Sequence, residues 1–377
     1  MFFPNLDGLR FFSFLVVFCY HCYKTIFANI SGTTSHAVVK QLFHHGTLGV
    51  NFFFVLSGFL ITFLLIREME LTGDVAVRKF YVRRILRIWP LFYACVAAGF
   101  LVFPLLKKAM GEGPAEIANP WYYVFMVNNF DFMKSWPLVP DALILSVLWS
   151  VAVEEQFYLS WPVLVRIFRI KLLPALMLGI VVATLVFRSF HLGLTEAEYG
   201  VRYFHTLSVI GDMAIGGLLA YLAATKPLFL QRLYQVPRWV IIIAYALAMV
   251  VMLYKTTIFN AHPVLLLFER VIIALLFGFI ILEQNYCQHS FFKMERFPVI
   301  SKLGTYTYGL HCLHFIGIIA AGVLYGKLGL PRSNQWGSFS EAVVALLLSI
   351  GIAFLSYRFF ESWFLKLKDR FAIIVRG

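Results

Sequence analysis

Charged residues are scarce in this sequence of 377 residues. Asp, Glu, Lys and Arg together make up only 14% of it, whereas hydrophobic residues make up 61%, and the mean hydropathy is +0.81. A soluble domain needs much more charge than this on its surface. The composition therefore excludes an ordinary soluble protein and indicates a polytopic membrane protein.

Cysteine is also rare, and no cleavable signal is apparent at the start. Four of the five cysteines fall within apolar runs, namely Cys19, Cys22, Cys95 and Cys312. This placement excludes the disulfide framework of a small secreted domain. The first apolar run continues to Phe27 without a small-residue cleavage site, so we expect a first transmembrane helix. Cys19, His21 and Cys22 lack a second pair of sulfur ligands nearby, and we expect no metal site.

Apolar runs of roughly 20 residues, long enough to cross about 30 Å of hydrocarbon, recur along the chain. We predict an all-α polytopic membrane protein with about ten transmembrane helices, each placed to within about four residues. It forms one integral membrane domain over residues 1–377, without a separate soluble domain. The predicted spans are residues 11–29, 47–66, 88–106, 141–165, 173–190, 205–225, 239–254, 264–283, 304–325 and 341–360.

The distribution of basic residues predicts the orientation. An even number of spans places both termini on one side, and that side holds the larger share of Lys and Arg, so both termini are predicted to be cytoplasmic. The net charge of +13 is spread over short loops. It is therefore explained by topology, and no nucleic acid is expected as a partner. No internal repeat, of the kind typical of transporters, is visible.

Two polar residues interrupt the first predicted span, "NLDGLRFFSFLVVFCYHCY". On a helix Arg10 and His21 would be about 16 Å apart along the axis, with an angular offset of about 20°, so they share one stripe. Since an unpartnered imidazole is costly in hydrocarbon, we expect His21 near mid-bilayer to face the bundle or a water-filled cavity. Two interpretations stay open: a functional pair, or a hydrogen-bonded core histidine with a snorkelling arginine.

The fourth predicted span, "LWSVAVEEQFYLSWP", carries Glu154 and Glu155 about midway. A carboxylate beside a neutral histidine holds its tautomer and raises its basicity, which makes imidazole a competent general base toward a hydroxyl. Adjacent residues point 100° apart on a helix, so only one glutamate would face His21, and we favour Glu154. The alternative is a structural carboxylate bonded to neighbouring helices.

A basic cluster, "RKFYVRRILRIWP", lies at the predicted cytoplasmic entrance to the third span. Arg84 and Arg87 are three apart and share a helical face. Guanidinium groups suit phosphate, so the cluster could hold the phosphates of a cytoplasmic ligand. The alternative is that the positive-inside rule and anionic lipid head groups account for it.

Other polar and aromatic residues favour structural interpretations. Glu269 and Arg270 are expected to balance one another within the eighth span. His311 and His314 are expected to share a face of the ninth. Four aromatic residues of a polar outer stretch could stack on sugar rings, but placement at the bilayer interface is favoured: Trp121, Tyr122, Tyr123 and Trp136.

Six blocks follow one another along the chain: "NLDGLR", "GVNFFFVLSGFLIT", "FYVRRILRIWPLFY", "LWSVAVEEQFYLSWP", "LGTYTYGLHCLHF" and "SYRFFESWF". With the Arg10 and His21 pair, they resemble the membrane-bound acyltransferase 3 family of bacterial O-acyltransferases nearly end to end. The last block departs slightly, with Trp363 where a proline often follows Glu361. Some members carry a fused extracytoplasmic hydrolase-like domain; we expect this chain to complete the transfer alone or with a partner.

The resemblance implies a multi-pass enzyme of the bacterial inner membrane. It would move an acyl group, usually acetyl, from cytoplasmic acyl-CoA to a hydroxyl of a glycan or glycolipid. Acetyl-CoA or another acyl-CoA would be a cosubstrate, with no tightly bound cofactor, and membrane lipids would surround the protein. His21 would be the catalytic base, oriented by Glu154 or Glu155. The residues expected to bind CoA are Arg10, Arg83, Arg84 and Arg87.

Three other classes stay open. A transporter or flippase of a lipid-linked or acylated substrate would also bury charge near the midplane. A haem protein could use His21 with His311 or His314 as axial ligands. A sensor or scaffold could keep the fold without the chemistry.

Overall fold

The computed structural model describes residues 4–113 and 115–371. All regular secondary structure in this part of the chain is helical, and it contains no β-strand. The all-α prediction is confirmed. The long helices are α1 (Pro4–Lys24), α3 (Thr47–Thr72), α4 (Val77–Ala97), α8 (Leu148–Ser189), α10 (Thr206–Thr225), α12 (Arg238–Phe259), α13 (Pro263–Tyr286), α15 (Thr307–Lys327) and α16 (Gln335–Ser356).

Shorter helices connect or extend the long ones. They are α2 (Thr34–Phe43), α5 (Phe103–Ala109), α6 (Pro120–Val124), α7 (Asn128–Ser135), α9 (Glu196–Phe204), α11 (Pro227–Tyr234), α14 (Pro298–Gly304) and α17 (Ser362–Asp369), with single turns η1 (Phe27–Ile30), η2 (Ala98–Val102), η3 (Leu143–Val147), η4 (Met294–Arg296) and η5 (Tyr357–Glu361).

Eight helical segments in the described part are long and apolar enough to cross a membrane, as judged by length and composition. This is the architecture of a polytopic membrane protein. The segments are Thr34–Thr72, Val77–Ala109, Leu143–Ser189, Glu196–Thr225, Arg238–Phe259, Pro263–Tyr286, Thr307–Lys327 and Gln335–Asp369.

Two features account for the difference between these eight segments and the ten predicted spans. The first predicted span corresponds to α1, whose apolar character is lowered by Asp7, Arg10, His21 and Lys24. The fourth and fifth predicted spans both lie in α8, which is continuous for 42 residues except at Arg169, where φ is 55° and ψ is 171°. The predicted loop between them is therefore a break at one residue.

The break in α8 is fixed to the turn between α3 and α4. Arg169 donates a hydrogen bond to the carbonyl of Gly73 at 3.0 Å, and Arg166 forms an ion pair with Asp74 at 2.7 Å. Gly73 ends α3 with a φ of 78°, a conformation that favours glycine. These contacts hold the two halves of α8 against one turn.

Glycines let α3 and α10 pack with their backbones in contact. A Cβ atom on Gly58 would lie 2.0 Å from the carbonyl oxygen of Met213, and one on Gly216 would lie 2.0 Å from that of Val55. Membrane helices associate through small residues in this way because lipid offers no hydrophobic driving force between helices. The α3 and α10 pair, which α8 also contacts, forms the central packing unit.

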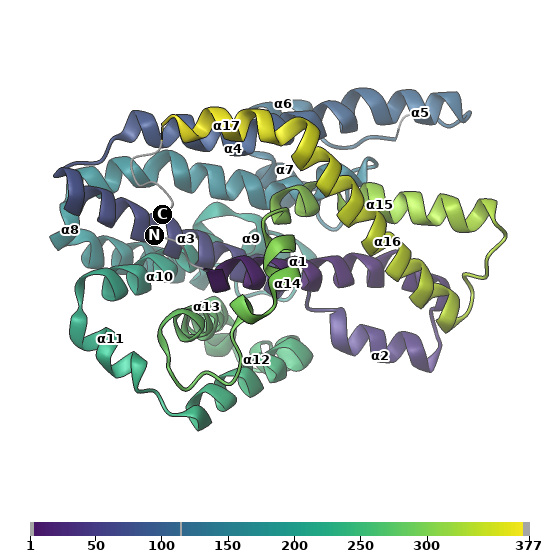
Figure 1. The fold of residues 1–377 in the computed structure, drawn as a ribbon. Coiled ribbons are helices and arrows are strands. Elements are labelled where there is room, and N and C mark those ends of the chain that lie inside the picture. Colours follow the sequence, from purple (N-terminus) through teal and green to yellow (C-terminus); the bar gives the residue numbers. More distant parts are fainter. Residues whose placement is uncertain (1–3, 114, 372–377) are drawn as a thin grey trace.

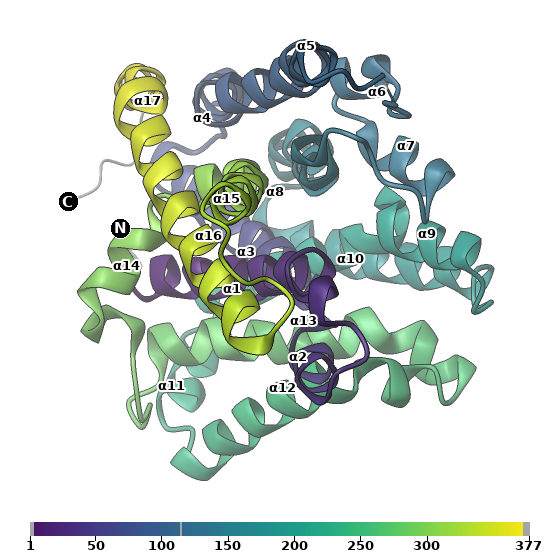
Figure 2. The same cartoon turned by 90° about the vertical axis from the view of Figure 1, so that its right-hand side faces the viewer.

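Helix α1 lies near the middle of the molecule, where it contacts α3, α13, α14 and α15 (Figure 2). It begins toward the left of Figure 1, where α17 also ends, and runs toward the side of α2 and the turn between α15 and α16. We call the two sides of the molecule the α17 end and the α2 end. Residues along α1 therefore reach both ends of the protein.

Candidate active site

Arg10 and His21 both lie on α1, as predicted. They stand eleven positions apart on one helix, a rise of about 16 Å. Arg10 is near the α17 end and forms an ion pair with Asp7. His21 lies in the last turn of α1 toward the α2 end. The two residues therefore lie near opposite ends of the protein, although they belong to one helix.

His21 forms a side-chain pair with His314 of α15. Nδ1 of His21 lies 2.7 Å from Nε2 of His314, and the two rings meet edge to edge in nearly the same plane, with centroids 4.9 Å apart and planes 17° apart. His314 is fully buried, and the rings of Phe14, Phe18 and Phe315 surround it. The pair therefore sits against an apolar background.

The hydrogen bonds of His314 determine where the protons of the neutral pair lie. Nδ1 of His314 is 2.8 Å from the carbonyl oxygen of His311 and 3.1 Å from that of Leu310. A carbonyl only accepts, so Nδ1 of His314 carries the proton and its Nε2 is an acceptor. Nδ1 of His21 must then donate to it, and the lone pair of His21 is on Nε2. Nε2 of His21 has no hydrogen-bond partner among the described residues.

His311 lies beside this pair on the same helix. Its Nε2 is 3.1 Å from the hydroxyl of Ser150 and 3.2 Å from the carbonyl oxygen of Val147, so it donates to the segment where α8 begins. Its Nδ1 is buried without a partner in the described part. The rings of His311 and His314 have centroids 6.3 Å apart.

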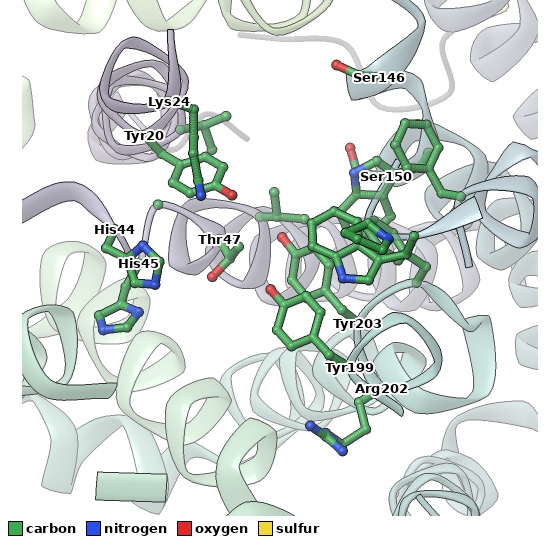
Figure 3. Close-up of a pocket in the computed structure, with 18 of the residues that line it drawn as sticks. Tyr20, Lys24, His44, His45, Thr47, Ser146, Ser150, Tyr199, Arg202 and Tyr203 are labelled. Atoms are coloured by element: carbon green, nitrogen blue, oxygen red, sulfur yellow. The ribbon is translucent and has the colours of Figure 1, made fainter. Parts of the chain in front are cut away.

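His21 and His311 line a cavity of about 660 Å³. Its wall is built from the last turn of α1, the first turns of α3, α8 and α13, the last turns of α12, and α9. Figure 3 shows polar side chains from these elements around a common open space, including Tyr20 and Lys24 on one side and Tyr199 and Tyr203 on another. His21 is therefore accessible to a molecule held in the cavity.

Arg84 and Arg87 of the predicted basic cluster lie with Arg10 in a second site, and we call these three residues the arginine cluster. The charge of Arg87 acts on both of the other two. The guanidinium of Arg84 lies 4.9 Å from the ring centroid of Tyr158. Among the described residues, neither Arg84 nor Arg87 has a hydrogen bond or ion pair to a carboxylate. Glu155 lies near enough to Arg84, and Glu361 near enough to Arg87, for opposite charges to attract, but neither arginine bonds directly to them.

Arg83 has different contacts from Arg84 and Arg87. It donates to the carbonyl oxygen of Phe371 at 2.9 Å and contacts the carboxylate of Glu68 at 3.4 Å. Glu68 is buried and also accepts the backbone N–H of Ala76. These bonds connect α4 to α3 and to the segment that follows α17.

The structure does not bring Glu154 or Glu155 to His21. Glu154 accepts hydrogen bonds from Ser57 at 2.8 Å and Tyr158 at 3.2 Å. Glu155 accepts the indole N–H of Trp89 at 2.8 Å, and its other oxygen is buried without a partner in the described part. The carboxylates belong instead with the arginine cluster, because the charge of Arg84 acts on both.

The separation follows from the length of α3. Tyr20, next to His21, packs against Gly46 at the start of α3, whereas Glu154 bonds to Ser57. Gly46 and Ser57 are eleven positions apart, about 16 Å along a helix. His314 therefore takes the place at His21 that the sequence analysis gave to a glutamate.

The expected balance of Glu269 and Arg270 is wrong. Arg270 pairs with Asp212 at 2.5 Å, while Glu269 pairs with Lys255 at 2.8 Å and Arg188 at 3.3 Å. Adjacent residues on α13 point in different directions, so each finds its partner on a different neighbouring helix. Within the described residues, no three His, Cys, Asp or Glu side chains come together as metal ligands.

Sequence comparison identifies the family. The profile of the Acyl_transf_3 family, an acyltransferase domain, matches residues 3–358. The chain belongs to this family. The resemblance seen in the sequence blocks is thereby confirmed, and so is the assignment as an acyltransferase.

Relatives of this acyltransferase domain include bacterial O-acetyltransferases. The chain is 26% identical over 377 residues to the peptidoglycan O-acetyltransferase OatA of Listeria monocytogenes, an alignment that covers 95% of this chain and 55% of that protein. It is 30% identical over 232 residues to the O-acetyltransferase OatA of Staphylococcus aureus, covering 58% of this chain and 34% of that protein. The chain thus spans about half the length of the curated relatives it matches. No solved structure matches it.

Proposed function

We propose that this acyltransferase domain moves an acyl group, in the first instance acetyl, from acyl-CoA to a hydroxyl of a glycan, with His21 as general base. The observation that carries the proposal is that His21 lines a 660 Å³ cavity and bonds on its other side to the buried His314. The Listeria relative, named as a peptidoglycan O-acetyltransferase, makes a cell-wall glycan the first acceptor to test. His21 offers the lone pair of Nε2 to that acceptor.

In the proposed step, Nε2 of His21 takes the proton of the acceptor hydroxyl. The hydroxyl oxygen attacks the thioester carbonyl carbon, the carbon–sulfur bond breaks, and the imidazolium returns the proton to the CoA thiolate. The Nδ1–H of His21 stays bonded to His314 throughout, so the imidazolium keeps its orientation. With a neutral partner in place of a carboxylate, the charge that develops on His21 is stabilised by hydrogen bonding alone.

The arginine cluster is the proposed site for CoA phosphates. Arg84 and Arg87 have no carboxylate partner in the described part, and guanidinium groups bind phosphate with charge-assisted hydrogen bonds. Arg10, held by Asp7, adds a third charge. Glu154 and Glu155 are then positioning residues of this cluster, and Arg83 holds α4 to its neighbours.

We further propose ten membrane crossings with both termini cytoplasmic. Helix α1 adds a crossing to the eight segments, and the break at Arg169 divides α8 into two. The positive-inside rule then puts the arginine cluster on the cytoplasmic side and the cavity on the other. Acyl-CoA would approach from the α17 end and the glycan from the α2 end, in a bacterial inner membrane.

The full chain in proteoliposomes, supplied with radiolabelled acetyl-CoA and cell-wall glycan, tests the proposal. We expect label in the glycan with the natural chain, and a loss of at least about a hundredfold with His21→Ala, as for removal of a general base. His289→Ala, an exposed histidine outside the cavity, is the matched control. Glycan movement that continues in His21→Ala without consumption of acetyl-CoA would instead identify a transporter or flippase.

A further inference from the structure

The cavity beside His21 has more basic than acidic residues on its wall. Its charged lining consists of five basic side chains, Lys24, Arg188, Arg202, Lys255 and Arg270, and two carboxylates, Glu196 and Glu269. Arg188, Arg202, Lys255 and Arg270 are buried. Charge buried in a membrane protein requires a partner, so the pairing of each group decides what the cavity attracts.

The carboxylates are already engaged. Glu269 is shared by Lys255 and Arg188, and Asp212, just behind the wall, pairs with Arg270 at 2.5 Å. Glu196 accepts the indole N–H of Trp136 at 2.6 Å. Glu196 keeps its negative charge beside this neutral donor, so the wall has five cations against three carboxylates, Asp212 included, and two of the cations have no ion pair among the described residues.

Those two cations are Lys24 and Arg202. Arg202 uses Nη1 alone, donating it to the carbonyl oxygens of His191 and Gly193, and it has no ion-pair partner among the described residues. Lys24 has no hydrogen bond or ion pair in that part of the chain, and its ammonium lies 5.5 Å from the ring centroid of Tyr23 and 5.9 Å from that of Tyr20. In Figure 3 the Lys24 ammonium points into the open space. The cavity therefore has a positive excess that an anion would neutralise.

The same wall carries groups suited to a sugar ring. The hydroxyls of Tyr20, Tyr199 and Tyr203 have no hydrogen-bond partner among the described residues, and Figure 3 shows the latter two directed into the cavity. The ring of Tyr203 packs 4.9 Å from that of Trp149, which also lines the cavity. Aromatic rings with polar tips pack against apolar ring faces while their hydroxyls bond to polar groups.

We infer that the acceptor bound in this cavity is an anionic sugar, whose carboxylate or phosphate group is held by Lys24 while its ring lies against Tyr199, Tyr203 and Trp149. The inference rests on the proposed function only for the statement that this ligand is the acceptor. Binding of an anionic sugar is inferred from the charges and the aromatic side chains of the wall, independently of the proposed function. Arg202, which bonds to backbone carbonyls, adds positive charge to the wall without contacting the ligand.

The test compares glucose-derived sugars with and without an anionic group. Binding of methyl glucoside, methyl glucuronide and glucose 6-phosphate to the full chain in nanodiscs is measured by saturation-transfer NMR, and acetyl transfer from labelled acetyl-CoA to each is measured in parallel. We expect at least one of the charged sugars to bind about tenfold more tightly than the glucoside, with a preference that weakens as salt is raised. The carboxylate and phosphate probes distinguish the two kinds of anion.

The variants are Lys24→Gln and, as matched control, Lys327→Gln, an exposed lysine at the end of α15 that is outside the cavity. Lys24 is exposed, so its replacement should leave folding intact. We expect Lys24→Gln to lose most of the preference for the charged sugar and Lys327→Gln to keep it. Equal binding of charged and neutral sugars by the natural chain, or an unchanged preference in Lys24→Gln, would overturn the inference.

Failure of the inference and failure of the proposed function give different results. A preference for charged sugars in binding, without acetyl transfer to any glycan, would support the anion site and contradict the O-acyltransferase proposal. Acetyl transfer that depends on His21, but is equally fast to charged and neutral sugars, would support the O-acyltransferase proposal and contradict the anion site.

Discussion

Nδ1 of His21 bonds to Nε2 of His314 across 293 positions of sequence. The bond joins the last turn of α1 to the second turn of α15, and it makes His314 a positioning residue for the proposed base.

Replacement of His314 tests that role. We expect His314→Leu to lower kcat for acetyl transfer by about tenfold to a hundredfold, because Nδ1–H of His21 loses its acceptor, while KM for acetyl-CoA stays the same. His314→Gln, which keeps an acceptor oxygen, should recover part of kcat. Steady-state kinetics on purified protein measures both, and an equal loss in Leu and Gln variants would reduce His314 to a packing residue.

The sequence predicted α1 and its two polar residues, because apolar runs and the 3.6-residue period are local properties. It could not predict the partner of His21, since pairing between distant helices depends on how they stack. His314 was noted for its spacing from His311, and Ser57 lay within a recognised block, but nothing in the pattern indicated that one bonds to His21 and the other to Glu154.

The break in α8 shows the opposite difficulty. Basic residues between two apolar runs are typical of a loop, and the sequence therefore separated the two spans. A single residue, Arg169, changes the direction of the chain there because its side chain bonds to Gly73 on another turn. Local pattern does not contain that contact.

The contacts of Arg83, Arg84 and Arg87 predict different roles for these three arginines of α4. Arg84→Gln and Arg87→Gln should each raise KM for acetyl-CoA by about tenfold, as for loss of a charged hydrogen bond. Arg83→Gln should instead lower the thermal unfolding temperature, since it removes contacts to Glu68 and Phe371, and leave KM unchanged. Acetyl-CoA titrations and thermal unfolding in detergent measure the two effects. If only Arg83→Gln raised KM, Arg83 would be the CoA-binding residue, and Arg84 and Arg87 would not.

Close packing of α3 against α10 predicts that adding a single methyl group at the contact lowers the stability of the fold. Gly58→Ala and Gly216→Ala each place a methyl group against a backbone carbonyl, so we expect a loss of about 1–3 kcal/mol in unfolding free energy. Gly351→Ala, on the exposed face of α16 with nothing within 4 Å, is the control and should be neutral or slightly stabilising. Unfolding temperatures of the three variants give the comparison. Equal effects would mean that the helices are not in backbone contact.

The buried pair of Arg270 and Asp212 predicts that loss of the carboxylate lowers stability, and that a second substitution at Arg270 restores it. Asp212→Asn leaves Arg270 charged without its partner, at an expected cost of about 3–5 kcal/mol. Adding Arg270→Met removes the orphaned charge and should restore most of the stability. The exposed pair of Arg166 and Asp74 provides the contrast, and Asp74→Asn should change the unfolding temperature little. Additive effects of the two buried changes would contradict a direct pair.

Arg10 and His21 belong to one uninterrupted helix, α1. This helix therefore links the arginine cluster to the cavity beside His21. Inserting one residue between Arg10 and His21 would turn the imidazole by 100° relative to the guanidinium, while lengthening α1 by only 1.5 Å. The angular register of α1, more than its length, therefore fixes whether the base points at His314 when the arginine points at its own cluster.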